Sequence, residues 1–509
     1  MIFFVLIFTI FFIVLAIRRL DWALMLLFFL LPSYLIRFKF GIPLTLLEVM
    51  IWVMFLVWFF KNYKGVYQNL KCKLKIGNCK LESVHDYPFK WEMIALVIIS
   101  FIAVGVAGFS IEAMGIWKAY FFEPILLYIV VFNVFWKEAF VEEKHTPASG
   151  HPSLERILGK IVYPLVLSAL IISLFAVFQK FTGFFIPNSL WAAEATRRVT
   201  SVFGYPNAVG LYLEGIILLM VGFVILSATK WREKSLEGEN ANFKKSLTFV
   251  RNDKGKNVLM IITILLSILS IIFAKSVGAS LGVGAGLIVF ALLINKKVRR
   301  VTLGLLIIAV IVVSSVGSLR HTALKYLTLN DFSGQVRRAQ WQETITMLRD
   351  KNHWLLGVGL DNYQNAVRPY HKPGFFVKDF NDPKAQRKLV FNAAYRTAHW
   401  QPLEIFMYPH NIILNFWSEL GVFGMLLFVW IILKFFYLGF RFLRNCNLEI
   451  RNYTKAEKYF VVSLVSIMVA IIIHGLVDAP YFKNDLSVLF WLWILMMGLI
   501  DLSNRRIIS

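Results

Sequence analysis

Two arginines and a histidine stand where polar segments of the chain meet long apolar runs. Arg198 precedes the apolar run that begins near residue 207, and Arg337 lies in a long polar segment that ends at His410. A guanidinium binds phosphate oxygens through a planar pair of N–H donors and keeps its charge at physiological pH. An imidazole near its ordinary pKa can accept a proton from a hydroxyl group. A lone histidine at such a boundary is more often a hydrogen-bonded structural residue, and that alternative stays open.

Together these groups suit the displacement of a diphosphate leaving group by a sugar hydroxyl. A diphosphate already leaves well, so the protein needs only to neutralise its developing charge and deprotonate the nucleophile. A metal ion is then dispensable, and we expect neither a metal nor another cofactor. The sequence has no Walker motif, no His-Glu-x-x-His and no Asp-x-Asp pair; Asp379 with Asp382 makes a weak metal pair. Cys72, Cys79 and His85 fit no zinc spacing.

The composition excludes a soluble enzyme. Hydrophobic residues make up 58% of the 509 positions, charged residues only 17%, and Phe alone occurs 47 times. A soluble domain is nearer half apolar and a quarter charged. The apolar residues also fall in blocks long enough to cross a bilayer. We therefore predict an all-α, polytopic transmembrane helix bundle.

Thirteen apolar blocks are predicted to span the membrane. The first has no basic start and no Ala-x-Ala cleavage site, so it is interpreted as a span and not as a signal peptide. The predicted spans are 2–17, 22–36, 44–60, 91–110, 119–136, 158–180, 207–228, 257–274, 277–294, 301–317, 411–438, 459–478 and 485–502.

The orientation follows from the basic residues of the short loops. The loops after the odd-numbered spans and the C-terminal tail are rich in Lys and Arg, whereas the alternate short loops are poor in both. Cytoplasmic loops collect these residues, so the N-terminus is predicted outside the cell and the C-terminus inside. The same rule explains most of the net charge of +24 without nucleic acid as a partner. The three cysteines, Cys72, Cys79 and Cys446, fall in loops predicted to be cytoplasmic, where thiols stay reduced.

Three regions are expected: transmembrane helices over 1–317, a large extracytoplasmic loop over 318–410 and three further transmembrane helices over 411–509. From residue 318 to 409 the large loop has thirteen Lys or Arg residues against seven Asp or Glu. Loops this long escape the positive-inside rule, so their charge needs another cause. One cause is attraction to lipid headgroups. The other is a site for a polyanionic substrate embedded in the membrane.

One stretch of the large loop has the spacing of an amphipathic helix. Trp341, Ile345 and Leu348 fall on one face of a predicted helix over 335–349. We expect this helix to lie over the mouth of the bundle and to end at Gly357-Val358-Gly359. A second outer loop, about 181–206, contains Arg197 and Arg198.

Several ionisable residues fall in the outer halves of the predicted spans. Charged groups inside a membrane are costly and usually face a cavity or a partner. Asn411, Asn415 and Ser418 also share one side of a span. Bonding between helices explains any one of these groups, whereas their shared depth favours a polar vestibule open to the outer leaflet. The acidic residues are Glu48, Glu123, Glu214, Glu419 and Asp478.

The order of these motifs resembles the O-antigen ligase and O-antigen polymerase superfamily. The resemblance rests on the run from Asp331 through Arg337 to Trp341, then Gly357-Val358-Gly359, Tyr408-Pro409-His410-Asn411, and Glu419 with Gly421 and Gly424. Further similar runs are 198–207, which ends in Pro206-Asn207, and 474–485, which contains His474 and Asp478. The resemblance covers most of the chain, and its matching motifs are densest over about 195–490.

The resemblance implies an inverting, metal-independent glycosyltransferase. Such enzymes move a glycan from undecaprenyl diphosphate, in the outer leaflet of the inner (plasma) membrane, to an acceptor hydroxyl. By the same resemblance Arg337 binds the diphosphate, His410 is the general base and Arg198 has a supporting role. Arg197, Arg338, Lys275 and Asn411 are further predicted substrate-binding residues, and Glu419, His474 and Asp478 are supporting polar residues.

The chain departs from the family at one motif. Many members have Ser-Arg-Gly-Ala at the outer start of a span, and here the run is Ser276-Val277-Gly278-Ala279. Lys275 is a possible substitute for the missing arginine, although a point charge does not reproduce the guanidinium fork.

The acceptor stays open at this stage. Lipid A core of lipopolysaccharide, a protein, a cell-wall polymer or the growing glycan are all compatible with the sequence, and the last would make the enzyme a polymerase. Other partners are membrane lipids. One alternative function is a lipid-linked glycan flippase or other polytopic transporter, which needs a polar path through both leaflets. Another is a metal-dependent oligosaccharyltransferase, but the first outer loop, 37–41, has no acidic residue.

Overall fold

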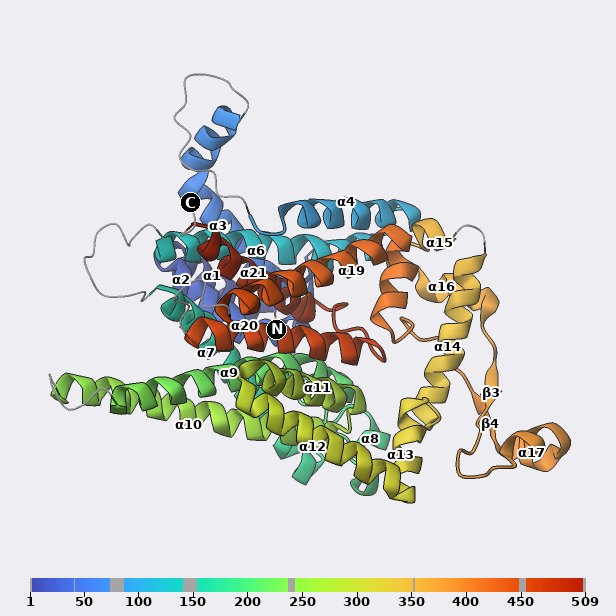
Figure 1. Cartoon of the computed structure of the whole chain (residues 1–509). Coiled ribbons are helices and arrows are strands. Elements are labelled where there is room, and N and C mark those ends of the chain that lie inside the picture. The colour runs from blue at the N-terminus through green and yellow to red at the C-terminus, as the bar shows by residue number, and fades with distance from the viewer. Residues whose placement is uncertain are drawn as a thin grey trace.

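The computed structural model is a bundle of long helices with a helical segment lying across one end (Figure 1). It describes residues 2–40, 42–73, 87–140, 153–236, 243–350, 353–447 and 455–506. The only sheets in these residues are two small antiparallel hairpins. The all-α polytopic fold class predicted from composition is therefore confirmed. Cys79 and His85 lie outside the described residues.

The elements before the large loop are mostly long and apolar. In chain order they are α1 (Ile2–Arg18), α2 (Leu20–Phe29), the 3₁₀ turn Leu31–Leu35, β1 (Arg37–Phe40), β2 (Ile42–Thr45), α3 (Leu46–Lys73), α4 (Lys90–Val106), α5 (Ile111–Ile116), the π-helical turn Trp117–Phe122, α6 (Glu123–Phe140), α7 (Ser153–Thr182), α8 (Ser189–Ala192), the 3₁₀ turn Glu194–Thr196, α9 (Pro206–Leu236), α10 (Phe243–Ala274), α11 (Val277–Ile294) and α12 (Lys296–Ser315).

The large loop contains shorter elements, and three long helices follow it. They are α13 (Gly317–Leu327), α14 (Phe332–Arg349), α15 (His353–Leu356), α16 (Tyr363–Val367), the 3₁₀ turn Arg368–Tyr370, β3 (Gly374–Phe376), α17 (Ala385–Phe391), α18 (Ala393–Ala398), β4 (Trp400–Pro402), α19 (Ile412–Asn447), α20 (Lys455–Gly475) and α21 (Asn484–Arg506).

A helix lies at each of the thirteen predicted spans. Ten helical segments in the described residues are long and apolar enough to cross a membrane. The helices α1 and α2 are apolar but shorter, and α4 has 17 residues. Length and apolar content thus identify a multi-pass membrane protein.

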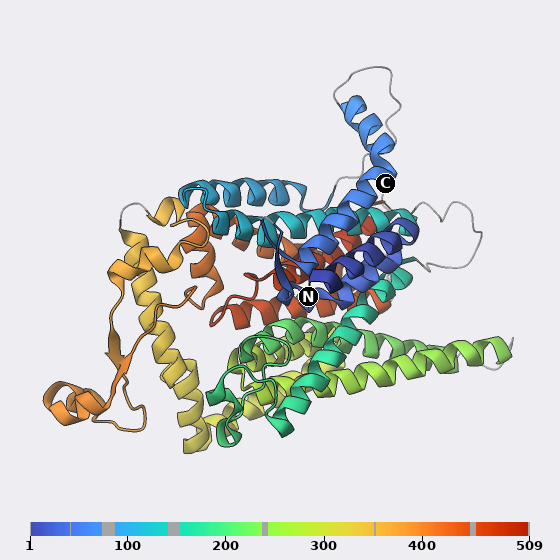
Figure 2. The ribbon, with the colours of Figure 1, turned by 180° about the vertical axis from the view of Figure 1, so that it is seen from behind.

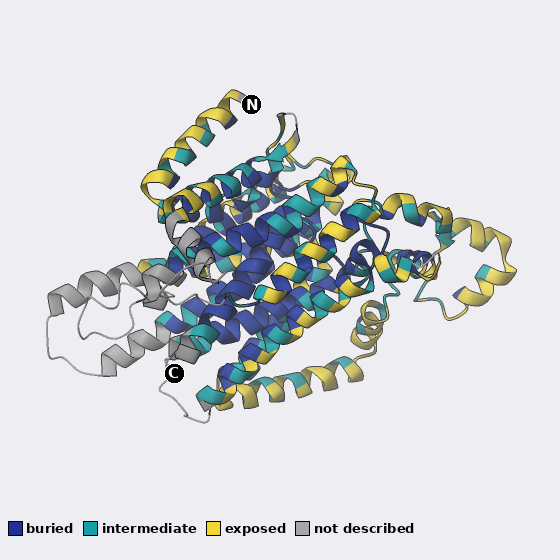
Figure 3. Cartoon of the chain, turned by 90° about the horizontal axis from the view of Figure 1, so that it is seen from above, coloured by how far each residue is buried: buried dark blue, intermediate teal, exposed yellow. Residues whose placement is uncertain are grey.

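The helices differ strongly in how far they are buried. α9, α20 and α21 occupy the centre, and large side chains such as Trp491 and Trp493 are enclosed there. At the periphery, α12 has no buried residue in its apolar stretch. Figure 3 shows this gradient from a buried centre to exposed outer helices. The exposed apolar faces are those that lipid would cover.

A stripe of glycines lets α11 pack closely against the centre of the bundle. Gly278, Gly282 and Gly286 recur every four residues, so they share one face of the helix. A Cβ atom at Gly282 would lie 2.9 Å from the Ala470 carbonyl oxygen of α20 and 3.1 Å from Glu214 Oε2 of α9. Small residues at this spacing let helix backbones approach closely in membranes.

Several buried acids are bonded in pairs between helices. Glu48 accepts from Lys118 Nζ at 3.1 Å and Asn484 Nδ2 at 3.2 Å, and Trp52 Nε1 donates to Glu123 at 2.8 Å. Bonding between helices therefore explains why Glu48 and Glu123 occur inside the predicted spans.

The large loop begins and ends at one end of the bundle, called the loop end here. α14 crosses this end at a steep angle to the long helices, and Figure 2 shows the same crossing from behind. Asp331 caps α14 by accepting from the Gly334 N–H at 3.2 Å. The buried face of α14 is centred on Gln340, Thr344 and Met347, so the predicted amphipathic helix is present with its buried face rotated from the expected one.

The Gly-Val-Gly run does not end the amphipathic helix, contrary to expectation. α14 ends at Arg349, and Gly357 follows the separate short helix α15. The Val358 N–H donates to the Ser418 carbonyl of α19 at 2.7 Å. A Cβ at Gly357 would lie 2.6 Å from that oxygen, and one at Gly359 would lie 2.5 Å from the Ala107 nitrogen. Both glycines therefore permit the loop to dock on the bundle.

The loop docks against α19 at a point where the backbone of that helix is not helical. Gly421 has φ 72° and ψ −176°, a conformation that only glycine adopts readily. Changing Gly421 to Ala is expected to destabilise the protein by about 3 kcal/mol, because the new Cβ would also lie 2.2 Å from the Leu355 carbonyl oxygen. The measurement is the melting temperature of the purified protein in detergent.

Gly304→Ala on α12 is the matched control for this prediction. Nothing lies within 4 Å of a Cβ at Gly304, so this variant should melt at or slightly above the wild-type temperature, since Ala is the better helix former. Equal melting temperatures for the two variants would show that the break at Gly421 is not required.

Candidate functional site

Arg337 is carried to the loop end by α14. Trp341, one turn further along this helix, donates its indole N–H to the Pro409 carbonyl at 2.8 Å. Residues four apart share a helix face, so this bond holds the Arg337 face against the segment that contains His410. Arg337 is half-buried, and its buried Nε has no hydrogen-bond partner among the described residues.

His410 lies in the short link between Pro409 and α19. Its φ is +46°, in the left-handed region that is uncommon for a residue with a side chain. Asn411 fixes the link on the other side: its Oδ1 accepts from the Leu414 N–H, and its Nδ2 donates to the Leu476 carbonyl, both at 3.0 Å. The His410 ring lies 4.7 Å from the Tyr408 ring, centroid to centroid. A strained backbone held from both sides is typical of functional positions.

Asp478 is the common neighbour of the groups at this end. Its carboxylate, 1% exposed, accepts from Asn207 Nδ2 at 3.2 Å, from the Ala479 N–H at 2.8 Å and from the Tyr408 hydroxyl at 3.5 Å. Burial alone would raise the pKa of Asp478. The positive charges of His474, His410 and Arg337 and the Ala479 N–H together hold that pKa below its ordinary value. The carboxylate therefore stays ionised among cations.

Arg198 reaches the same carboxylate through Asn207. Arg198 Nε donates to the Ala274 carbonyl at 3.0 Å, and a terminal nitrogen donates to Asn207 Oδ1 at 3.1 Å. Burial lowers the pKa of Arg198, and the positive charge of Arg337 lowers it further. Two guanidinium groups from separate loops thus act on one another at this end of the bundle.

The pKa of His410 is lowered by the same surroundings. Burial is the largest cause, Arg337 adds to it, and Asp478 opposes it. A histidine with a lowered pKa is neutral near pH 7 and can accept a proton. Arg198, Arg337, His410 and Asp478 form one cluster at the loop end. This cluster therefore combines fixed positive charge with a neutral base.

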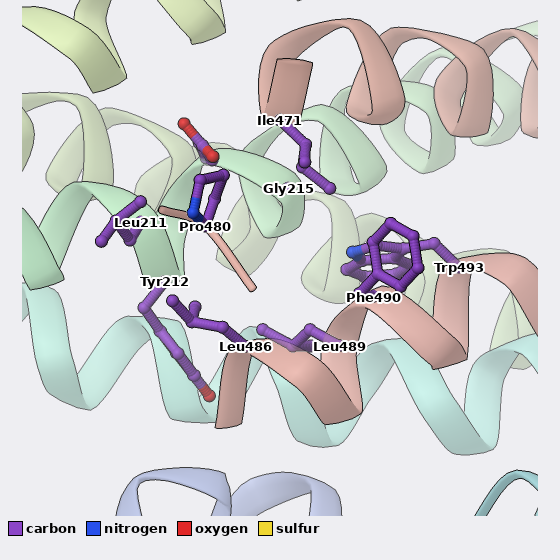
Figure 4. Close-up of a pocket in the computed structure, with 10 residues that line it drawn as sticks. Leu211, Tyr212, Gly215, Ile471, Pro480, Leu486, Leu489, Phe490 and Trp493 are labelled. Atoms are coloured by element: carbon purple, nitrogen blue, oxygen red, sulfur yellow. The ribbon is translucent and has the colours of Figure 1, made fainter. Parts of the chain in front are cut away.

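A second histidine lies deeper beside this cluster. His474 Nδ1 is 2.8 Å from Glu214 Oε2, and both side chains are 1% exposed. The two residues come from α20 and α9. Glu214 also lines a small and mostly apolar hollow, together with Leu211, Tyr212, Pro480 and Trp493 among others (Figure 4). Its lining contains no Lys, Arg or His, so it is not the anion site.

Four predicted binding residues are directed elsewhere. Arg197 donates to the Ala192, Lys180 and Phe181 carbonyls at 3.1, 2.9 and 3.3 Å, which ties the outer loop to the end of α7. The exposed side chain of Arg338 bonds Asn330 Oδ1 at 2.9 Å.

The other two are Lys275 and Asn411. The exposed Lys275 bonds the Thr196 carbonyl at 3.3 Å. The side chain of Asn411 bonds the Leu414 N–H and the Leu476 carbonyl and so holds the link that contains His410. Glu419 also sits apart from the cluster, next to the Gly421 break, and its Oε2 has no partner among the described residues.

Three residues that bond the predicted site residues are not identified as site residues by the sequence. Asn207 and Tyr408 were noted only as parts of motifs, and Glu214 only as a buried acid. Each now bonds a predicted residue: Asn207 and Tyr408 bond Asp478, and Glu214 bonds His474. Within the described residues no group of three or more His, Cys, Asp or Glu is arranged to hold a metal ion.

Residues 262–429 match a family model described as O-antigen ligase. No curated protein matches the chain. The matched range runs from within α10 to within α19, so it contains Arg337 and His410 but not Arg198, His474 or Asp478. Over residues 262–429 the chain is similar to the O-antigen ligase family, and its long apolar helices make it a multi-pass membrane protein.

Proposed function

We propose that the protein transfers a glycan from undecaprenyl diphosphate to an acceptor hydroxyl on the outer face of the inner membrane. Arg337 and Arg198 bind the diphosphate, and His410 is the general base. The reaction inverts the anomeric centre and needs no metal ion. The observation that carries the proposal is that the charge of Arg337 acts on Arg198, His410 and Asp478 at the loop end, where Asn207 also links Arg198 to Asp478.

The charge of the cluster fits a diphosphate. When the bond between the anomeric carbon and the phosphate oxygen breaks, the leaving lipid diphosphate gains one negative charge. Guanidinium groups that are partly removed from water stabilise that charge far more than they would in bulk solvent. The unpartnered Arg337 Nε supplies an N–H that no described protein group occupies.

His410 removes the proton from the acceptor hydroxyl. The acceptor hydroxyl oxygen forms the new bond to the anomeric carbon while His410 takes its proton. Attack from the face opposite the leaving group inverts the configuration. Because the pKa of His410 is lowered, the ring is neutral and able to act as a base at pH 7.

The location of the reaction follows from the charge of the short loops. The positive-inside rule puts the basic loops in the cytoplasm and the loop end outside. The three-region division of the chain at residues 317 and 410 is part of the same proposal. A donor held by its polyprenyl chain in the outer leaflet would then meet the cluster from the side of the membrane.

The test is a transfer assay with the purified full-length protein in liposomes. The donor is undecaprenyl diphosphate carrying a fluorescent oligosaccharide, and either unlabelled donor or lipid A core is the acceptor. We expect a larger fluorescent product and free undecaprenyl diphosphate, with the same rate in the presence of EDTA. Counterflow of intact donor across the bilayer without product would contradict the proposal and favour a flippase.

The choice of acceptor separates two forms of the proposed function. Product formed on a second donor molecule would make the protein a polymerase, and product formed only on lipid A core would make it a ligase. Sizing the surface glycans after deletion of the gene gives the same distinction in cells: a polymerase deletion loses long chains, whereas a ligase deletion keeps them unattached.

A further inference from the structure

The first turn of α11 lies beside Arg198 at the loop end. The first N–H groups of any helix have no partner within the helix and carry a partial positive charge, which favours bound anions. Arg198 Nε bonds the Ala274 carbonyl, three residues before α11 begins. The helix is 18 residues long, and its Ncap residue Ser276 makes no side-chain capping bond.

Two buried polar atoms at this turn have no partner among the described residues. One is the Ser276 hydroxyl, in a residue that is 2% exposed. The other is Nε2 of His474. A buried polar atom without a hydrogen bond costs about 1–3 kcal/mol, so two at one turn indicate a missing partner.

The His474 ring packs directly on the first turn of α11. A Cβ at Gly278 would lie 2.5 Å from His474 Cδ2 and 2.9 Å from Nε2. Only a glycine at this position leaves room for the ring. Glu214 holds the opposite nitrogen, Nδ1, at 2.8 Å. The pairing fixes the ring so that Nε2, and not Nδ1, is directed to the helix start.

We infer that the first turn of α11, the Ser276 hydroxyl and His474 Nε2 form a second phosphate-binding subsite, next to the one formed by Arg198 and Arg337. The inference rests on the proposed function, because the ligand is one phosphate of the lipid diphosphate. A diphosphate has two phosphate groups, and the two subsites hold one each. An imidazolium has an N–H on both nitrogens, so His474 can bond Glu214 and a phosphate oxygen together.

Position 277 is Val, and the neighbouring Lys275 is exposed and bonds the Thr196 carbonyl. Neither residue provides a buried positive charge at the first turn of α11. The ring of His474, from α20, packs on this turn and provides a buried donor there.

The test measures binding of undecaprenyl diphosphate without a glycan to the purified full-length protein in detergent. His474→Asn keeps a polar group but is too short to reach Nε2. We expect it to weaken diphosphate binding at least tenfold (about 1.4 kcal/mol). Binding of undecaprenyl phosphate, which needs only the arginine subsite, should change less than threefold. An unchanged affinity for the diphosphate would overturn the inference.

Ser276→Ala keeps the test decisive if His474→Asn does not fold. The Ser276 hydroxyl has no protein partner, so removing it should leave the melting temperature unchanged while weakening diphosphate binding several-fold. The matched control is Ser280→Ala, one turn further on, where the hydroxyl bonds the Ser276 carbonyl at 2.9 Å. The control should bind like the wild type. Equal binding by the Ser276 and Ser280 variants would contradict the subsite.

The same experiment separates failure of this subsite from failure of the proposed function. If the wild type does not bind undecaprenyl diphosphate above a detergent background, the proposed donor is wrong. If the wild type binds, Arg337→Ala does not, and the Ser276 and His474 variants bind normally, only the second subsite is wrong. Free pyrophosphate and inorganic phosphate are measured in parallel, and tight binding of either would assign the subsite to a soluble anion instead.

Discussion

Replacement of Arg337 by Ala is expected to reduce glycan transfer by about 10³-fold, the range seen when one charge-stabilising donor is removed from an active site. The side chain is half-buried at the loop end, and its Nε has no partner among the described residues. Its loss leaves the developing charge of the leaving diphosphate with Arg198 as the remaining guanidinium. The assay is transfer of a fluorescent oligosaccharide in liposomes, at equal amounts of membrane-inserted protein.

The neighbouring arginine provides the control. Arg338 differs by one position, is exposed and bonds Asn330, so it carries the same charge without facing the cluster. Arg338→Ala should keep at least a third of the wild-type rate. Equal losses in both variants would show that the net charge of the loop matters and that the position of Arg337 does not.

Replacement of His410 by Ala is expected to reduce transfer by about 10²–10⁴-fold, the usual contribution of a general base. His399 is the control because it belongs to the same loop, stacks on the Tyr395 ring at 3.8 Å and lies outside the cluster. His399→Ala should transfer at a rate near that of the wild type. Normal transfer by the His410 variant would remove this residue from the mechanism.

The pH dependence of the wild type gives an independent check on His410. A general base works in its neutral form, so transfer is lost as pH falls through the pKa of the base. Burial and Arg337 lower the pKa of His410. The midpoint of the acidic limb of the rate profile should therefore lie at a pH below the ordinary imidazole pKa of about 6.5. A limb above that value would contradict the assignment. The limb should be absent from the residual rate of His410→Ala.

The bundle could be predicted from the sequence because its signal is local. Each span is a run of apolar residues whose length alone indicates a membrane crossing. The same holds for α14, where helical spacing is visible within one stretch of chain. Its rotation was harder to predict, because Trp341 is apolar in type but uses its N–H to bond the Pro409 carbonyl.

The pairing of distant residues could not be predicted in the same way. His474 and Glu214 are 260 positions apart, and nothing near either residue indicates the other. Arg197 and Arg198 show the opposite difficulty, since they are adjacent and identical in type. The turn that contains them directs Arg197 to backbone carbonyls at the end of α7 and Arg198 to Asn207.

Motif resemblance located Gly357, Gly359 and Gly421 without giving the reason for them. The structure explains them as one contact, in which the loop backbone approaches α4 and the break in α19 too closely for any side chain. These glycines therefore serve the docking of the loop on the bundle.

In the proposed function, Arg337, Arg198 and His410 share one chamber that receives the lipid diphosphate. The most direct measurement is an experimental structure of the full-length protein with undecaprenyl diphosphate bound. We predict diphosphate density within hydrogen-bond distance of the Arg337 guanidinium, with the His410 ring facing the position of the anomeric carbon. Diphosphate density at another part of the bundle, or Arg337 and His410 too far apart to contact one ligand, would contradict the account.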